Sequence, residues 1–183
     1  MLESLFPIAA YVERAGIDPA SLVARCRLPA CVLTDAELLI PTASLGRLLD
    51  AAARHGDDAI GALAGQAADI ATLGTFGRLI RGAPTLGEAL EAIVQHHPAF
   101  NSSGRVWVDS HGADVELCQV FTNVDERWRQ TAFYVLTLMV NVVRLAAGPA
   151  WRPLAAKSQA AAFRARHDVE CLSGTRIERV AAR

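Results

Sequence analysis

Apolar residues recur every three to four positions through most of the first hundred residues, which is the spacing of amphipathic helices. The opening stretch shows the pattern, since Leu5, Ile8 and Val12 fall on one helical face. Glycine and proline residues separate one periodic stretch from the next. The pattern predicts helices over residues 2–15, 19–26, 35–40, 42–55, 57–69, 73–81 and 85–97.

Several of these helices carry signals at their ends or in their interiors. Asp18 stands directly before a proline, which is typical of an N-cap and the first turn of a helix. Thr85 is followed three residues later by Glu88, the pattern of a capping box. Gly61 and Gly65 lie inside a predicted helix, where each costs about 1 kcal/mol relative to alanine. We therefore expect another helix to pack closely against them.

The period changes from helical to two in "RVWVDSHGADVELCQVF", which predicts an antiparallel hairpin around residues 110–113. A long helix is expected from about 125 to 147, then a short helix over 160–167 and two short strands over 169–173 and 176–180. The prediction is an α+β fold in one domain, residues 1–183: a helical half to about residue 100, then a small, mainly antiparallel sheet packed by the long helix.

Composition and charge exclude several classes of function. With 52% hydrophobic residues the chain can bury a core, and 18 basic against 19 acidic residues give a net charge of -1. Such a balance argues against direct binding to nucleic acid or to an anionic membrane. The most apolar segment, 131–148, contains Asn141 and Arg144 and is expected to be a buried core helix. The four cysteines show no C-x-x-C spacing and no secretory leader opens the chain, which favours the cytoplasm.

Candidate chemistry gives no sign of catalysis. Gly74, Gly77 and Gly82 match no phosphate-loop motif, and we expect close packing at the first two and a positive φ at Gly82. His96 and His97 are adjacent on a helix and lack a third metal ligand at a recognised spacing. The sequence contains no nucleophile elbow or zinc-protease motif. We expect no enzyme activity, no metal and no cofactor.

Aromatic residues gather around the hairpin and the start of the long helix, and two interpretations remain open. They fill a core, or they line an apolar pocket between helix and sheet whose rim carries an arginine or a histidine that orients a small carboxylate. For the pocket, Arg129 is the candidate anion anchor. The candidate lining residues are Phe76, His97, Trp107, Trp128 and Phe133.

The segment "LGTFGRLIRGAPTLGEALEAIVQHH" and the hairpin after it resemble the N-terminal effector domain of one branch of AraC-type bacterial transcriptional regulators. Looser similarities extend over nearly the whole chain. The resemblance implies a cytoplasmic, homodimeric sensor of a small-molecule effector such as an amino acid, an amine or an aliphatic acid. It also implies that promoter DNA is bound only through a C-terminal segment with two helix-turn-helix units, absent from this chain, and that no membrane is involved.

A second hypothesis is a constitutive dimerisation module with no small-molecule ligand, in which the helix over 131–147 or the N-terminal helices form the dimer face. The two hypotheses differ in what they require of the interior. A pocket beside Trp107 and Phe133 would favour effector sensing, whereas a filled interior would favour the dimerisation module.

Overall fold

The computed structural model describes residues 2–35, 37–55, 57–102, 104–121, 129–159 and 165–180. Its helices are α1 (Phe6–Arg14), α2 (Pro19–Arg25), η1 (Ala30–Leu33), α3 (Thr42–Ala53), α4 (Ile60–Ala67), η2 (Ile70–Thr72), α5 (Gly74–Arg81), α6 (Leu86–Phe100), α7 (Arg129–Ala147) and α8 (Arg166–Ser173). Its strands are β1 (Leu2–Ser4), β2 (Leu39–Pro41), β3 (Gly104–His111), β4 (Asp114–Phe121), β5 (Ala156–Ser158) and β6 (Ile177–Arg179).

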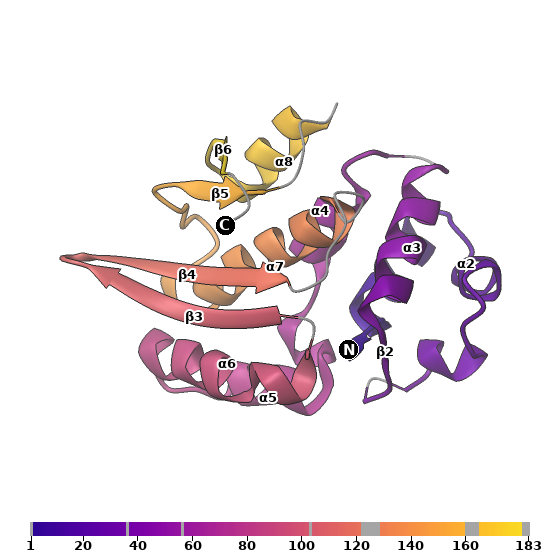
Figure 1. The fold of residues 1–183 in the computed structure, drawn as a ribbon, viewed down its shortest axis with the longest axis horizontal. Coiled ribbons are helices and arrows are strands. Elements are labelled where there is room, and N and C mark those ends of the chain that lie inside the picture. Colours follow the sequence, from indigo (N-terminus) through magenta and orange to yellow (C-terminus); the bar gives the residue numbers. More distant parts are fainter. Residues whose placement is uncertain are drawn as a thin grey trace.

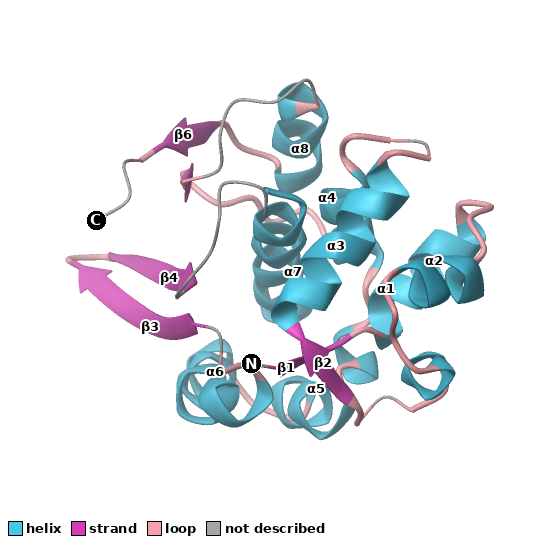
Figure 2. Cartoon of the chain, turned by 45° about the vertical axis from the view of Figure 1, so that its right-hand side comes forward, coloured by secondary structure: helices cyan, strands magenta, loops and turns pink. Residues whose placement is uncertain are grey.

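The fold is α+β, as the sequence predicts, with helices before the central hairpin and a long helix packed over it (Figure 1). The strands form three pairs: antiparallel β1–β2, antiparallel β3–β4 and parallel β5–β6. Figure 2 shows β3, β4 and β6 at one margin of a body made mainly of helices, and β1–β2 among the helices. The predicted hairpin is confirmed, since β3 and β4 pair from Gly104 with Phe121 to His111 with Asp114 around Gly112, whose φ is +67°.

The helix signals read from the sequence are confirmed at atomic detail. The Asp18 carboxylate accepts hydrogen bonds from the backbone N–H groups of Ala20 and Ser21, both at 3.1 Å. The Thr85 hydroxyl oxygen accepts from the N–H of Glu88 at 3.2 Å, and the Thr85 hydroxyl donates to the Glu88 carboxylate at 2.7 Å. Both caps satisfy N–H groups that a helix leaves without internal partners.

The α4–α7 interface, formed by Gly61 and Gly65 of α4 with Gln130, Thr137 and Asn141 of α7, confirms the close packing expected at the two glycines. A Cβ atom at Gly61 would overlap the Gln130 carbonyl oxygen, and one at Gly65 would overlap Thr137 Oγ1. Side chains of α7 then bond to the backbone of α4. The Gly61 N–H donates to Gln130 Oε1 at 2.9 Å, and Asn141 Nδ2 donates to the Gly65 carbonyl at 3.0 Å.

Three local predictions are wrong. Residues 39–41 form strand β2 rather than a helix, because proline at 41 disfavours helical backbone at Ile40 and the segment pairs with β1. The expected strand over 169–173 lies within helix α8, which the Arg166–Glu170 ion pair supports one turn apart and Gly174 ends at φ +83°. Gly82 has φ −82°, and in that region the positive φ is found at Gly74.

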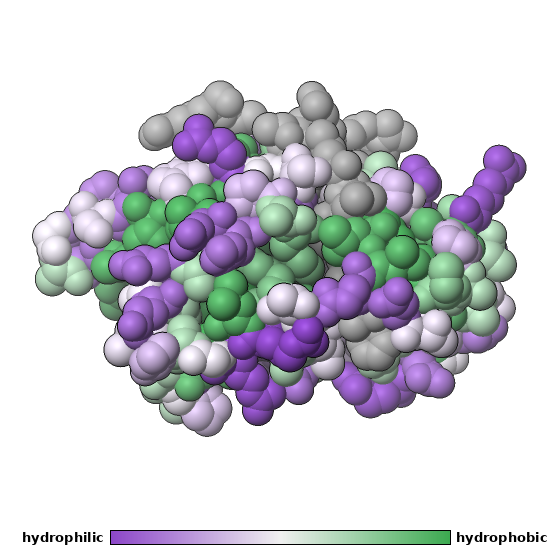
Figure 3. Space-filling model, turned by 90° about the horizontal axis from the view of Figure 1, so that it is seen from below, coloured by the Kyte–Doolittle hydropathy of each residue, from purple (hydrophilic) through white to green (hydrophobic). Residues whose placement is uncertain are grey.

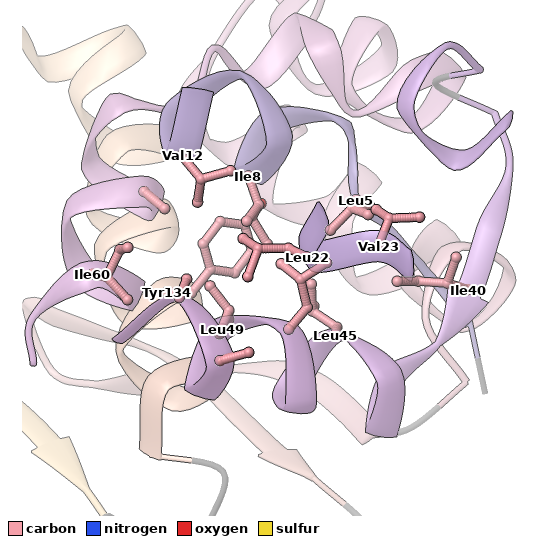
Figure 4. Close-up of a cluster of buried hydrophobic side chains, with 14 of the residues drawn as sticks. Leu5, Ile8, Val12, Leu22, Val23, Ile40, Leu45, Leu49, Ile60 and Tyr134 are labelled. Carbon is pink, nitrogen blue, oxygen red and sulfur yellow. The ribbon is translucent and has the colours of Figure 1, made fainter. Parts of the chain in front are cut away.

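Buried side chains form three clusters around α7. The largest joins the N-terminal helices to Tyr134 of α7, and Figure 4 shows its members pointing inward from several elements. A second contains Phe133 between α4 and α8, and a third joins η2, α5 and α6 to Val106 of β3. By length and composition alone α7 passes as a membrane span. Its contributions to all three clusters instead support the prediction of a core helix.

Candidate functional site

A groove of about 250 Å³ lies between α5, α6 and the segment that leads into β2. We call it the α5–α6 groove. Seen from below, the molecule presents hydrophobic surface broken into separate areas by hydrophilic residues (Figure 3). The groove is lined by Glu37, Leu39, Leu73, Thr75, Phe76, Leu79, His96, Ala99 and Phe100. Its size is near the lower end of small-molecule sites, which begin at about 300 Å³.

An aromatic pair forms part of the groove wall. The rings of Phe76 and Phe100 stack with centroids 4.5 Å apart and an angle of 14° between their planes. Close packing beneath α5 fixes the position of Phe76, because a Cβ at Gly77 would overlap the carbonyl oxygen of Ile70. On the same helix Leu79, which also lines the groove, is 43% exposed.

The polar rim centres on Glu37, whose carboxylate sits at the beginning of α5. Its Oε1 atom accepts hydrogen bonds from the N–H and the hydroxyl of Thr75, both at 2.9 Å, and from Arg78 Nη2 at 3.1 Å. The Thr75 hydroxyl bond and the bonds from Arg78 and the Thr75 N–H lower the pKa of Glu37. The carboxylate thus caps α5 from a distant segment and holds the chain before β2 against that helix.

The two adjacent histidines of α6 point to different environments. His96 is exposed and lines the groove, whereas His97 is 6% exposed. Among the described residues, no group hydrogen-bonds to Nδ1 of His97. Burial lowers the pKa of His97, which favours its neutral form.

The structure places the predicted site residues in several regions. Phe76 lines the groove, and His97 lies on the neighbouring helix α6. Trp107 alternates with Val106 along β3, so its side chain is on the face of the hairpin away from the α5–α6 cluster. There its Nε1 donates to Asp109 at 2.8 Å.

The remaining candidates lie around the start of α7. Arg129 forms an ion pair of 2.7 Å with Asp58, and Phe133, 1% exposed, packs in the cluster between α4 and α8. Trp128 lies outside the described residues. Of the predicted set, Phe76 is the member that lines the groove.

Sequence reasoning missed most of the groove. Glu37 lay in a stretch predicted to be helical, and nothing in its neighbourhood connects it to Thr75, 38 positions away. One signal in the sequence could have indicated the groove. Helix α5 is short and amphipathic, and it carries Phe76 and Leu79 in addition to the apolar residues that it buries. Phe100 follows a proline inside α6, where we expected the helix to have ended.

The described residues contain no group of three histidine, cysteine or acidic side chains placed to hold a metal ion. Among the cysteines, Cys26 and Cys118 are half-buried, and burial raises the pKa of both thiols. A raised pKa keeps a thiol protonated and lowers its reactivity.

Comparison with protein families places most of the chain in a known family. The family model described as the N-terminal arabinose-binding domain of AraC transcription regulators covers residues 16–176 of the 183. The matched range includes every helix from α2 to α8 and both strands of the central hairpin. No curated protein matches the chain.

Proposed function

The chain belongs to the family of N-terminal arabinose-binding domains of AraC transcription regulators, and on that premise we propose that it is a homodimeric sensor whose small-molecule effector binds in the α5–α6 groove. The family is one of regulatory ligand-binding domains and not an enzyme family. The observation that carries the proposal is the groove itself, which combines a half-buried aromatic wall with a single fixed carboxylate on its rim.

Regulation follows if the effector binds one conformation of the domain more tightly than another. Differential affinity shifts the population toward the tighter-binding state, whatever the total affinity. The groove joins α5 and α6 to the segment before β2, so a ligand there would change how that segment is held. We propose that this change is passed to a DNA-binding segment outside these residues, which binds promoter DNA in the cytoplasm.

The other predicted site residues remain proposed effector contacts. Trp107 lies on the face of the hairpin away from the α5–α6 cluster, Arg129 and Phe133 lie in the first turns of α7, and Trp128 directly precedes α7 in the chain. His97 is a buried residue of α6. If the effector binds beside Trp107 instead, the proposed regulatory role is unchanged, but the binding site is not the α5–α6 groove.

The rival hypothesis is a dimerisation module with no ligand. It is favoured by two large apolar side chains that remain on the surface, Leu145 at 50% and Leu154 at 87% exposure. Such side chains are common at interfaces between subunits. Both hypotheses predict a dimer, and only the sensor hypothesis predicts that a small molecule binds. An experiment that distinguishes them must therefore detect a ligand.

Thermal denaturation of the 183-residue chain against a panel of metabolites tests the proposal. A ligand that binds the native state at a hundred times its Kd stabilises it by about 2.7 kcal/mol. We expect at least one compound to raise Tm, and we expect Phe76→Ala to lose that response. Leu154→Ala, which removes an exposed apolar side chain elsewhere, is the matched control and should keep it.

Two outcomes would contradict parts of this proposal. A compound that stabilises the wild type and the Phe76→Ala variant equally would place the effector outside the groove, and Trp107→Ala would then be tested. A dimer that responds to no compound in a broad panel would favour the rival module.

A further inference from the structure

We propose that the α5–α6 groove takes a small molecule with one ammonium group on a compact apolar body, and that Glu37 is the partner of the ammonium. This inference rests on the proposed function, because it names the ligand class for that site. Three features of the groove carry it: its charge, its aromatic wall and its size.

Glu37 carries the only fixed charge among the nine lining residues. Its Oε1 accepts all three of its hydrogen bonds, from Thr75 twice and from Arg78 once. Among the described residues none donates to its Oε2. The carboxylate is thus held in place through one oxygen and offers the other, with its share of the negative charge, to a donor in the groove.

Arg78 does not reverse this preference. It pairs with Glu37 at 3.1 Å and is not among the residues that line the groove. Both side chains of this pair are more than half exposed, so the pair is weak and solvent-screened. An anionic ligand would place its own charge beside Glu37, whereas an ammonium would gain a charge-assisted hydrogen bond.

The aromatic pair favours the same sign of charge. Phenylalanine rings attract cations to their faces, and Phe76 and Phe100 both border the groove. Leu39, Leu73 and Leu79 complete an apolar surface for the body of the ligand. A carboxylate next to aromatic and aliphatic walls matches a molecule that has a cationic end and an apolar end.

The volume limits the size of that molecule. A dry cavity of about 150 Å³ accommodates benzene. The groove, at about 250 Å³, therefore has room for one ring and a short side chain. Larger ligands would extend beyond the lining residues into solvent.

Three probes that differ only in their polar end test the ligand class: 2-phenylethylamine, 2-phenylethanol and phenylacetate. Their binding to the 183-residue chain is measured by NMR titration of backbone amides. We expect the amine to bind about twofold to fivefold more tightly than the alcohol, which is the range for an ion pair at a carboxylate that is more than half exposed. We expect phenylacetate to bind most weakly, and the amide of Thr75 to shift in the titration with the amine.

Two variants with matched controls test the site. Glu37→Gln keeps an oxygen for Thr75 and Arg78 but removes the charge, so the preference for amine over alcohol should disappear. Glu91→Gln, on the exposed face of α6, should preserve it. Ala99→Trp fills the groove from an exposed position and should abolish binding of both probes, whereas Ala24→Trp, exposed on α2, should not.

The inference is overturned if phenylacetate binds as tightly as the amine, if no probe binds at about 10 mM, or if Ala99→Trp leaves the amine affinity unchanged. These failures are separable from failure of the proposed function. A metabolite of another class that stabilises the chain and loses its effect in Phe76→Ala would refute the ammonium ligand and leave the sensor proposal standing.

Discussion

The α4–α7 interface and the α5–α6 groove both lie between helices, but the first is closely packed and the second is open. At the α4–α7 interface, Gly61 and Gly65 let the two backbones approach until no side chain fits between them. At the α5–α6 groove, Phe76 and Leu79 project from α5, and about 250 Å³ remains open beside them. The glycines of α4 allow close contact with α7, whereas the large side chains of α5 border an open groove.

Polar groups also serve the two regions differently. In the α4–α7 interface the side chains of Gln130, Thr137 and Asn141 bond to backbone groups of α4, so that the buried polar atoms are paired within the protein. In the groove, the hydrogen bonds that Glu37 receives from described residues all go to Oε1. The three paired side chains of α7 support the fold, whereas the exposed Glu37 carboxylate has an oxygen open to a ligand.

The largest expected effect comes from Gly65→Ala. The new Cβ would overlap Thr137 Oγ1 and the Tyr134 carbonyl oxygen, so the helices must separate. We expect a loss of about 3 kcal/mol in the free energy of unfolding, measured by urea denaturation. The control is Gly87→Ala in α6, where the nearest atom to the new Cβ is Thr85 Oγ1 at 3.9 Å, and it should be neutral or slightly stabilising. Equal stabilities for the two variants would refute the tight interface.

Gln130→Leu should come next. The variant keeps much of the side-chain volume, but it leaves the Gly61 N–H and the Asp58 carbonyl without their partner. Unsatisfied buried groups cost about 1–3 kcal/mol, and we expect about 2 kcal/mol by the same urea measurement. A change below about 0.5 kcal/mol would mean that water replaces the lost bonds and that the interface is less dry than the contacts indicate.

Leu79→Ala tests the groove side of the comparison. Because Leu79 is 43% exposed, we expect a loss of less than about 1 kcal/mol in stability together with weaker binding of 2-phenylethylamine. Leu145→Ala is a control of similar exposure, 50%, in the last turn of α7 and outside the groove lining. It should cost a similar amount of stability and leave binding unchanged. Equal losses of binding in both variants would contradict a ligand in the groove.

The smallest expected effect is a pH dependence from His97, which lies on α6 behind the groove. Burial lowers its pKa in the folded state, so below its ordinary pKa of about 6.5 the unfolded chain binds a proton that the folded chain resists. The stability is complete above that value and decreases as the pH falls below it. We expect His97→Gln to flatten the slope of unfolding free energy between about pH 5 and 7. The exposed His96→Gln should leave the slope as it is.

Local structure was predictable wherever neighbouring residues decide it. The caps at Asp18 and Thr85 and the hairpin around Gly112 depend on a few consecutive residues, and all were predicted. The stretch over 169–173 failed because five residues of alternating polarity suit a strand or a helix equally, and the contact of Val169 with the second cluster decides between them. The helix predicted over 35–40 failed for two other reasons: Pro41 disfavours helical backbone at Ile40, and the segment pairs with β1, more than thirty positions away.

The sequence by itself determined the α+β class, the order of most helices, the hairpin and the family, because each depends on periodicity, turn residues or a contiguous motif. Only the tertiary structure decided which side chains share a site. Glu37, Phe76 and Phe100 come from three segments that meet in space, and no local pattern encodes that meeting. Packing of the whole domain around α7 fixes their positions, and for that reason the groove could be found in the structure and not in the sequence.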